Sequence, residues 1–196
     1  MTQVVLASGN AGKLRELNLA LNPVGFSLVS QTELGLPSPD ETGLSFVENA
    51  LLKAREASRA SGLSAIADDS GLCVDCLDGA PGIYSARFGD GTDSGNLRAL
   101  VQTLKQNAHP YPWHAHYHCT LVFVRTADDP DPLIAQGRWH GQIINSPQGE
   151  GGFGYDPIFY LPDLNCTAAE LDKETKNRLS HRGIAASTLT RMLRDL

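Results

Sequence analysis

Ala65-Ile66-Ala67-Asp68-Asp69-Ser70-Gly71 places two consecutive carboxylates directly after a short apolar run. Apolar character resumes at Leu72-Cys73-Val74, so we expect the two aspartates near the edge of a core. An ionised carboxylate in such a place needs a cation, hydrogen-bond donors or a metal. The pair is therefore a candidate functional site. The alternative is an Asp-Asp-Ser-Gly turn that caps its own backbone.

The two aspartates are expected to face different sides of the chain. Side chains alternate between the two faces of an extended segment, so Asp68 and Asp69 should point in opposite directions. We expect Asp69 to face the site and Asp68 to orient the backbone.

Composition restricts the class of protein. The 196 residues are 41% hydrophobic and 19% charged, which suits one soluble domain or two small lobes. Sixteen Lys and Arg against 22 Asp and Glu give a net charge of −6, which argues against a general nucleic-acid or acidic-membrane surface. No apolar run approaches the roughly 18 residues of a membrane span, and the N-terminus lacks the basic start of a signal peptide. We therefore expect a cytoplasmic protein.

A strand, a glycine-containing loop and a helix open the chain. Val4–Ala7 predicts the strand, Ser8-Gly9-Asn10-Ala11-Gly12-Lys13 is the loop, and the helix ends before Pro23-Val24-Gly25. Three leucines mark the buried face of this helix: Leu14, Leu17 and Leu21. This layout can direct backbone N–H groups and the positive helix end at a phosphate, although an ordinary strand-to-helix turn has the same pattern.

Lys13 supports the phosphate interpretation. A cation in the first helical turn lies at the unfavourable end of the helix dipole, at a cost of about 0.3–1 kcal/mol, which a docked anion would offset. The loop is not a Walker A motif, because Ala7 and Leu14 stand where that motif needs glycine and a hydroxyl.

A capping-box pattern at Ser45-Phe46-Val47-Glu48 begins a helix that runs to Gly62. Asn49 and Lys53 project from its partly apolar stripe. Lys53 either extends to water or reaches the same site as Lys13. Glu41, ahead of this helix, is a dipole-stabilising acid or a carboxylate presented to a cation, and the first interpretation is favoured on local grounds.

Five further segments read as scaffold. They are strands at 26–29, 72–77, 113–125 and 133–139, of which the last two can pair across an Asp/Pro turn, and a helix at 93–106.

Cysteines and histidines offer two weaker candidate sites. Cys73-Val74-Asp75-Cys76 matches C-x-x-C, but in a strand the two cysteines face opposite sides, which disfavours redox or zinc chemistry. His114, His116 and His118 share one strand face, where a solvent-facing edge explains them as well as a metal does.

A glycine-rich segment runs from Gln148 to Pro157 and carries Phe153, Tyr155 and Asp156. Its glycines allow close approach to the backbone, including at Gly154. An aromatic ring here could stack on a flat ligand, with Asp156 accepting from ring or sugar donors. The alternative is a hairpin whose aromatics fill the core.

The last helix is expected to begin near Ser180 and to bury Ala185, Leu189, Met192 and Leu196. Lys176, His181 and Arg182 gather at its N-terminus with no nearby acid in sequence, so a bound acceptor or a solvated basic patch would explain them.

Six ordered segments together resemble the inosine/xanthosine triphosphate pyrophosphatase family over essentially the whole chain. They are Ser8–Lys13, Glu41–Phe46, Ala67–Gly71, Pro81–Arg87, Gly152–Pro157 and Ser180–Gly183. The resemblance implies Mg²⁺-dependent hydrolysis of non-standard purine nucleotides (dITP, ITP and XTP) to the monophosphate and pyrophosphate, which cleanses the nucleotide pool. It also implies one domain over residues 1–196 with an elongated mixed α/β sheet, two lobes with the site in the cleft between them, and a homodimer.

The resemblance assigns roles to individual residues. Asp69 is implied as proton acceptor and metal contact, Glu41 as metal partner, and Asp68 is a further candidate for the metal. The implied substrate contacts are Ser8, Gly9, Asn10, Ala11, Gly12, Lys13, Ser70, Phe153, Gly154, Tyr155, Asp156, Lys176, His181 and Arg182, and Lys53 joins them as a possible counter-charge to the triphosphate. Cys73, Cys76, His114 and His116 do not belong to the family pattern.

The residue types suit this chemistry. Lys13, Lys53 and Mg²⁺ can offset the roughly four negative charges of a triphosphate, and Asp69 can orient or deprotonate a water that attacks the α-phosphorus. Two other classes stay open: a non-catalytic nucleotide sensor and a phosphotransferase acting at the γ-phosphorus.

Overall fold

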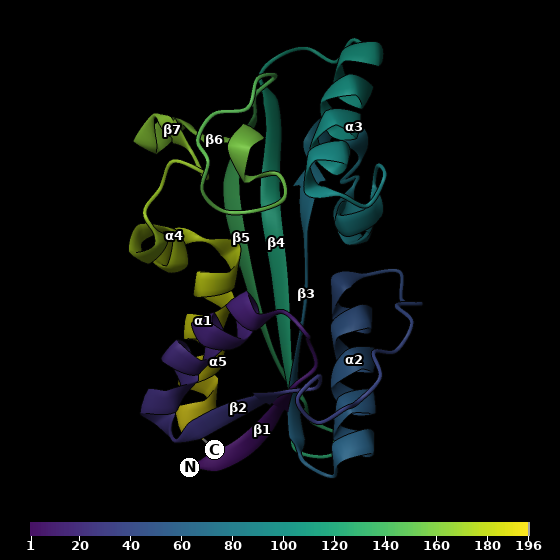
Figure 1. Ribbon diagram of the computed structural model, residues 1–196, viewed down its shortest axis with the longest axis vertical. Helices are drawn as coiled ribbons and strands as arrows, with labels where there is room; N and C mark the ends of the chain where they lie inside the picture. The colour runs from purple at the N-terminus through teal and green to yellow at the C-terminus, as the bar shows by residue number, and fades with distance from the viewer. Residues whose placement is uncertain (196) are drawn as a thin grey trace. The chain divides into compact units, whose positions relative to one another are not determined.

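The structure, a computed structural model, describes residues 1–195 and has an α/β fold (Figure 1). Seven strands form one sheet in the order β2-β1-β3-β4-β5-β6-β7. β1 pairs in parallel with β2 and β3, whereas β6 pairs antiparallel with β5 and β7. The predicted mixed sheet flanked by helices is therefore confirmed.

The strands are β1 Thr2–Leu6, β2 Phe26–Ser30, β3 Ser64–Val74, β4 Trp113–Val124, β5 Leu133–Ile143, β6 Phe159–Leu161 and β7 Cys166–Thr167. The α-helices are α1 Ala11–Leu21, α2 Phe46–Ser61, α3 Asp93–Gln106, α4 Lys173–Leu179 and α5 His181–Arg194. Short 3₁₀ helices are η1 Asn22–Val24, η2 Asp75–Leu77, η3 Gly82–Arg87, η4 Asp156–Ile158 and η5 Pro162–Leu164.

The chain divides into two compact units. The first contains residues 1–69, 119–137 and 182–196, and the second contains residues 70–118 and 138–181. The predicted site in a cleft between two lobes stays a prediction.

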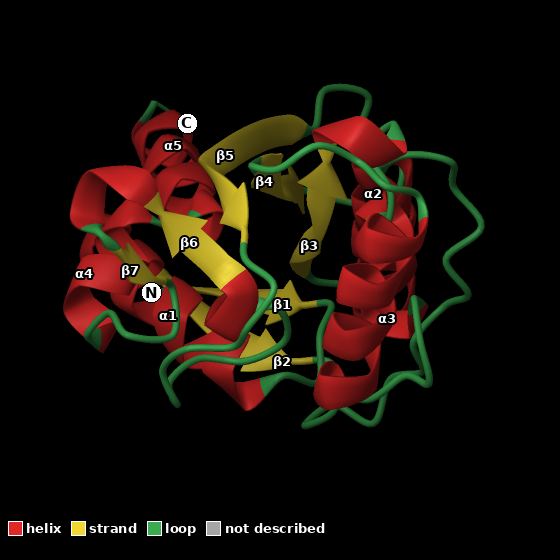
Figure 2. Ribbon diagram, turned by 90° about the horizontal axis from the view of Figure 1, so that it is seen from above, coloured by secondary structure: helices red, strands yellow, loops and turns green. Residues whose placement is uncertain are grey.

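Side-chain alternation along β1 builds the two cores of the first unit. Val4 and Leu6 pack with apolar residues of α1 and α5, whereas Val5 packs with the alanines of α2. Figures 1 and 2 both show α1 and α5 on one side of β1 and β2 and α2 on the other. Leu17 and Leu21 are fully buried and Leu14 packs beside them, which confirms the predicted face of α1.

The capping box of α2 forms as predicted. The Ser45 hydroxyl accepts from the backbone N–H of Glu48 at 3.4 Å, and the Glu48 carboxylate accepts from the N–H of Leu44 at 2.9 Å. Gly62 ends the helix with a φ of +71°, a conformation that favours glycine.

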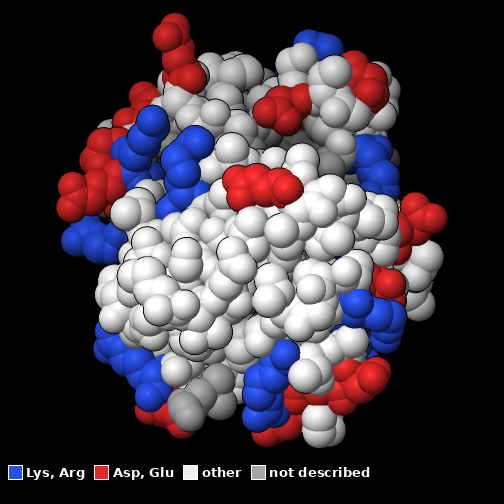
Figure 3. All heavy atoms as spheres, turned by 60° about the horizontal axis from the view of Figure 1, so that its bottom comes forward, with Lys and Arg blue, Asp and Glu red and all other residues white. Residues whose placement is uncertain are grey.

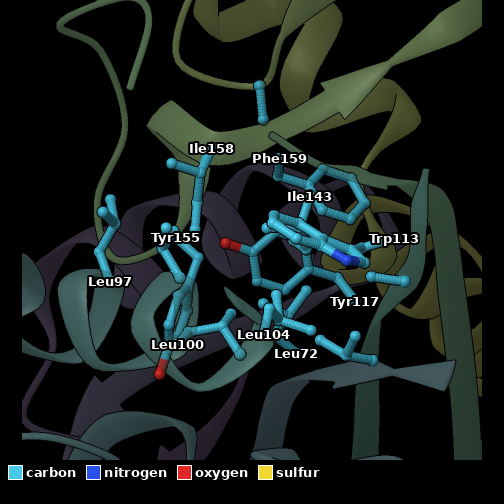
Figure 4. Close-up of a cluster of buried hydrophobic side chains, with 14 of the residues drawn as sticks. Leu72, Leu97, Leu100, Leu104, Trp113, Tyr117, Ile143, Tyr155, Ile158 and Phe159 are labelled. Atoms are coloured by element: carbon cyan, nitrogen blue, oxygen red, sulfur yellow. The ribbon is translucent and has the colours of Figure 1, made fainter. Parts of the chain in front are cut away.

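The second unit has an aromatic core. Tyr117 of β4 lies among apolar residues from β3, α3, β5 and β6, with its ring centroid 4.7 Å from that of Phe159 and 6.5 Å from that of Trp139. Figure 4 shows the Tyr117 ring beside Phe159 and Ile143. The strand predicted at 113–125 is confirmed, and β5 runs four residues beyond the predicted Trp139.

The structure excludes the alternative of a turn at the two aspartates. β3 continues without interruption from Ser64 to Val74, so Asp68-Asp69-Ser70-Gly71 is extended. The strand predicted at 72–77 ends at Val74, because Asp78 and Gly79 take positive φ values of 51° and 86° and turn the chain. Cys76 therefore lies in η2 rather than in a strand, and all four cysteines are free thiols.

The C-terminal region contains a short helix, α4, that the sequence pattern did not indicate. It ends at Leu179 with Ser180 as its C-cap, and α5 begins at His181, close to the predicted start. Ala185 and Leu189 are buried as predicted and Met192 is partly buried, whereas Leu196 lies outside the described residues.

Two expectations from composition can be compared with the structure. No helix among residues 1–195 is long and apolar enough to cross a membrane. On the face seen in Figure 3, Lys and Arg side chains lie among Asp and Glu side chains around an uncharged area, so that face carries no continuous basic surface.

The three histidines of β4 differ in burial although they alternate with core residues. His114 is exposed, His116 is half-buried and His118 is buried. Burial, with the nearby charges of Arg138 and His116, lowers the pKa of His118 to about 4. The part of the chain that the structure describes contains no group of three or more His, Cys, Asp or Glu side chains arranged to hold a metal.

The lowered pKa of His118 predicts a pH-dependent stability. Between about pH 6.5 and 4 the unfolded chain binds a proton at His118 that the folded chain does not, so acidification favours unfolding. Relative to His118→Gln, we expect the wild-type free energy of unfolding to fall across this range by up to about 1.4 kcal/mol per pH unit. Urea titrations at several pH values measure it, with exposed His114→Gln as the control. Parallel curves for wild type and His118→Gln would contradict the assignment.

Candidate functional site

The loop before α1 is held by its own side chains. Asn10 is the N-cap of α1, and its Oδ1 accepts from the backbone N–H groups of Gly12 at 2.8 Å and Lys13 at 3.2 Å. The Ser8 hydroxyl accepts from the N–H of Asn10 at 3.2 Å. Gly9, Asn10 and Ala11 are exposed. The loop is thus an ordered strand-to-helix turn whose outer surface remains accessible to a ligand.

Buried Asp68 forms an ion pair with partly buried Lys13 in the first unit. Lys13 Nζ lies 2.7 Å from Asp68 Oδ2 and 2.9 Å from Oδ1. Burial alone would raise the pKa of Asp68, but the charges of Lys13 and Arg182 hold it well below its usual range. The cation in the first turn of α1 therefore has an anionic partner within the chain.

Arg182, at the start of α5, belongs to the same network. It is 7% exposed, and its Nη1 lies 3.3 Å from Glu16 Oε2 of α1. Burial opposes its charge, but Asp68 and Glu16 raise the pKa of the guanidinium, which stays charged. Arg182 thus has acidic neighbours that are distant in sequence, contrary to the expectation of an uncompensated basic group.

Asp69 faces the opposite side of β3, as alternation predicts. Lys53 Nζ of α2 lies 3.0 Å from Asp69 Oδ1 and 2.7 Å from Glu41 Oε1. Lys53 is therefore not extended to water, and Glu41 is a carboxylate presented to a cation rather than a helix-dipole acid. Each of the two consecutive aspartates has its own lysine on its own face.

Asn49 connects these groups. It is fully buried on α2, its Nδ2 donates to Asp69 Oδ2 at 3.4 Å, and its Oδ1 accepts from the N–H of Gly43 at 2.8 Å. One amide thus fixes both the aspartate and the loop that carries Glu41. The sequence places Asn49 on an apolar stripe and does not indicate these partners, although a buried amide needs partners.

The electrostatics of this cluster suit a cation. Burial and the neighbouring Glu41 raise the pKa of Asp69, although Lys53 opposes the shift. Burial opposes the charge on Lys53, but Asp69 and Glu41 outweigh it and raise the pKa of the ammonium. Two carboxylates converge on one positive group.

The carboxylate pair fits Mg²⁺. This ion is commonly held by one or two carboxylates, with water and substrate phosphates completing the shell. The Lys53 ammonium shows that both Glu41 and Asp69 can reach the same cation. Asp68 is directed to Lys13 instead.

The glycine-rich segment of the second unit divides its two aromatics between surface and core. Tyr155 is 4% exposed and its hydroxyl donates to the backbone carbonyl of Ser85 at 2.8 Å, so it fills the core. Phe153 is 52% exposed, with Lys176 Nζ 5.2 Å from its ring centroid. Tyr155 therefore fits the interpretation of a core aromatic, and Phe153 fits that of an exposed ring able to stack on a ligand.

Asp156 anchors this segment from within. It is 3% exposed, and its Oδ2 accepts from the N–H of Phe153 at 2.7 Å and from Lys176 Nζ at 2.5 Å. A Cβ at Gly152 would lie 2.1 Å from that carboxylate oxygen. The N–H of Gly154 donates to Asp93 of α3 at 2.8 Å. The position of the Phe153 ring thus depends on a buried acid.

His181 lies against an aromatic ring that the sequence analysis treated only as scaffold. Its imidazole stacks on Tyr117 with ring centroids 4.7 Å apart and an interplanar angle of 10°. The hydroxyl of Tyr117 donates to Asp156 Oδ1 at 3.4 Å. Alternation along β4 places Tyr117 on its buried face, but only the fold brings it to His181 and Asp156.

The predicted residues therefore fall into two groups, one in each unit. The first unit holds Ser8 to Lys13, Glu41, Lys53, Asp68, Asp69 and Arg182, and the second holds Ser70, Phe153 to Asp156, Lys176 and His181. Glu16 and Asn49 in the first group, and Asp93 and Tyr117 in the second, are additions from the structure.

Comparison with known proteins gives consistent matches over the full length. The model of the Ham1 family matches residues 4–192. A relative from Escherichia coli O157:H7, named dITP/XTP pyrophosphatase, is 55% identical over 197 residues, with all of both chains covered. A solved HAM1 protein from Coxiella burnetii has a TM-score of 0.95 and 42% identity, with complete coverage of both chains. The Ham1 protein of Staphylococcus aureus has a TM-score of 0.88 and 36% identity, with 99% of each chain covered.

The buried ion network of Asp68 predicts a strong effect on stability. Asp68→Asn removes the anion that Lys13 and Arg182 share and leaves two partly desolvated cations. We expect the free energy of unfolding to fall by about 3 kcal/mol, as when one partner of a buried pair is removed. Urea denaturation measures the loss. Asp128→Asn, whose side chain is 96% exposed, is the control and should change stability by less than about 0.5 kcal/mol. Equal effects for the two variants would contradict the role of Asp68.

Proposed function

The chain belongs to the Ham1 family, and we propose that it hydrolyses non-standard purine nucleoside triphosphates, namely dITP, ITP and XTP, to the monophosphate and pyrophosphate. The relative from Escherichia coli O157:H7 carries the name dITP/XTP pyrophosphatase and matches over the whole length, which supports this substrate class.

The observation that carries the proposal is the convergence of Glu41, Lys53 and Asp69. Two carboxylates converge within 3.0 Å of one ammonium, in an arrangement that suits a divalent cation and a phosphate. We assign Glu41 and Asp69 to Mg²⁺ and leave Asp68 to Lys13 and Arg182, because Asp68 points to the other face of β3. When bound, Mg²⁺ neutralises charge that develops on the phosphate oxygens.

The segment Ser8 to Lys13 is proposed to hold the triphosphate. Its exposed residues precede the positive end of α1, where anions are favoured. Lys13 stays in place through Asp68, so the ammonium can contribute positive charge without a freely rotating side chain. Orienting a cation before the substrate arrives reduces the entropy cost of binding.

Asp69 is proposed to orient or deprotonate the attacking water. Its raised pKa makes it a better proton acceptor than an exposed aspartate, and the Asn49 amide holds one of its oxygens in place. The water oxygen forms a bond to the α-phosphorus, and the bond from the α-phosphorus to the oxygen that bridges it to the β-phosphorus breaks. Pyrophosphate leaves with the bonding electron pair.

The residues of the second unit are proposed to recognise the base. The exposed Phe153 ring can stack on a purine, and Gly154, Tyr155 and Asp156 shape the segment that presents it. Hypoxanthine and xanthine present an O6 acceptor, whereas adenine presents an amino group that would leave a donor of the site unpaired. His181 and Arg182 are the proposed donors, with Ser70 and Lys176 as further nucleotide contacts. A site built around a hydrogen bond rejects an analogue that lacks it by several kcal/mol.

Several further properties complete the proposal. The chain would act as one domain over residues 1–196, with the site in a cleft between two lobes. It would work as a homodimer in the cytoplasm and remove non-standard nucleotides before their incorporation into DNA or RNA. Two other functions are less favoured. A non-catalytic nucleotide sensor does not need a pair of carboxylates that suits a divalent cation. A phosphotransferase acting at the γ-phosphorus is disfavoured because the loop before α1 is not a Walker A motif.

The reaction products test the proposal directly. Incubation of the purified protein with ITP and Mg²⁺ should give inosine monophosphate and pyrophosphate, identified by ³¹P NMR. Values of kcat/KM should place ITP and XTP well above GTP, with ATP lowest. Orthophosphate as the only phosphorus product, or no turnover, would rule the proposal out.

Two isosteric substitutions test the assigned carboxylates. Asp69→Asn and Glu41→Gln should each lower kcat by at least about a hundredfold, because each removes charge that acts mainly in the transition state. Steady-state kinetics at saturating ITP measures this, and circular dichroism checks the fold. Glu56→Gln, an exposed acid on α2, is the matched control and should retain activity. Near-normal turnover by Asp69→Asn together with loss of turnover in Asp68→Asn would reverse the roles of the two aspartates.

A further inference from the structure

Lys53 occupies the position that a metal would need. Its ammonium lies 2.7 Å from Glu41 Oε1 and 3.0 Å from Asp69 Oδ1, and its side chain is 13% exposed. These are the two carboxylates proposed for Mg²⁺. The ion pairs are mostly shielded from solvent, so they are screened less than surface pairs.

An ammonium and a divalent cation cannot share these oxygens at close range. A metal held by Glu41 and Asp69 would need the two carboxylates that now accept from Lys53 Nζ. Both groups are positive and the site is partly desolvated, so their repulsion is strong. Metal binding therefore requires Lys53 to leave Glu41, Asp69 or both.

Among residues 1–195, the other two polar side chains of this cluster give a displaced Lys53 no free carboxylate. Asp68, the remaining carboxylate of the pair, points to the other face of β3 and is held by Lys13 at 2.7 Å. Asn49 supplies an amide rather than a charge. A displaced Lys53 would consequently favour an external anion, and a triphosphate brings one.

We propose that Lys53 acts as a resident competitor of the metal, which blocks the Glu41–Asp69 pair until a triphosphate draws the ammonium away. This inference rests on the proposed function and adds to it a dependence between two ligands. Without nucleotide, the carboxylate pair holds its own cation and binds metal weakly. With nucleotide, Lys53 contacts phosphate oxygens and the pair is released to the metal.

The arrangement couples the two binding events. A ligand that favours one position of Lys53 raises the affinity for any other ligand that favours the same position, and the coupling is reciprocal. The affinity of the protein for the metal should thus be high when nucleotide is bound and low when it is not.

Binding of Mn²⁺, measured by electron paramagnetic resonance of the free ion, tests the proposal without turnover. In the absence of nucleotide, Lys53→Met should bind Mn²⁺ at least about tenfold more tightly than the wild type, within the usual range of coupling between sites. Addition of the non-hydrolysable α,β-methylene analogue of ITP should tighten Mn²⁺ binding in the wild type by a larger factor than in Lys53→Met.

Matched variants separate charge from shape. Lys53→Arg keeps the positive charge and should not tighten Mn²⁺ binding, whereas Lys53→Gln should behave as Lys53→Met and replaces it if that variant does not fold. Lys105→Met removes an exposed lysine from α3 and controls for the overall charge. Lys53→Met combined with Asp69→Asn should lose the gain, which locates the ion at the carboxylate pair.

Equal or weaker Mn²⁺ binding by both uncharged Lys53 variants would overturn the proposal, as would an equal gain in Lys105→Met. The outcome is independent of the reaction assay. If the wild type releases pyrophosphate but the uncharged Lys53 variants bind Mn²⁺ no more tightly than it does, the competition by Lys53 is rejected and the proposed reaction stands. Tighter Mn²⁺ binding without pyrophosphate release would support the competition and reject the proposed reaction.

Discussion

The arrangement of the first unit depends on one constraint: two adjacent carboxylates within a continuous strand must each find a cation on a different face. Asp68 meets Lys13 of α1 and the charge of Arg182 at the start of α5, whereas Asp69 meets Lys53 of α2. These cations come from the helices that cover the two apolar faces of β1. The same alternation that buries valines and leucines on both faces therefore also separates the aspartate held by Lys13 from the aspartate held by Lys53.

The sequence predicted the elements that have strong local signals. Leucine spacing located the buried face of α1, and the serine–glutamate box located the start of α2. Alternation alone predicted that Asp68 and Asp69 face opposite ways, which the structure confirms. These predictions succeeded because each depends on neighbours within about one helical turn or one strand.

Long-range partners were beyond local reasoning. Lys13 and Arg182 looked uncompensated because their acids lie far away in sequence, at Asp68 and Glu16, and the fold alone brings them within reach. Likewise, nothing local indicates that Tyr117 stacks on His181. Nor did the sequence indicate that the strand expected at 72–77 begins at Ser64, because the cations that stabilise charge within β3 come from other elements. A charged residue with no oppositely charged neighbour in sequence is thus weak evidence for a bound ligand, because the fold can supply the partner.

The contrast between Phe153 and Tyr155 has a dynamic consequence. Tyr155 is locked in the core through Ser85, and the backbone of Phe153 is fixed by Asp156, yet the Phe153 ring itself is half in solvent. Exposed side chains change rotamer in picoseconds to nanoseconds. The Phe153 ring can therefore change rotamer while the aromatic core around Tyr155 stays packed. Because it has only two side-chain torsions to immobilise, a planar ligand could hold it at a small entropic cost.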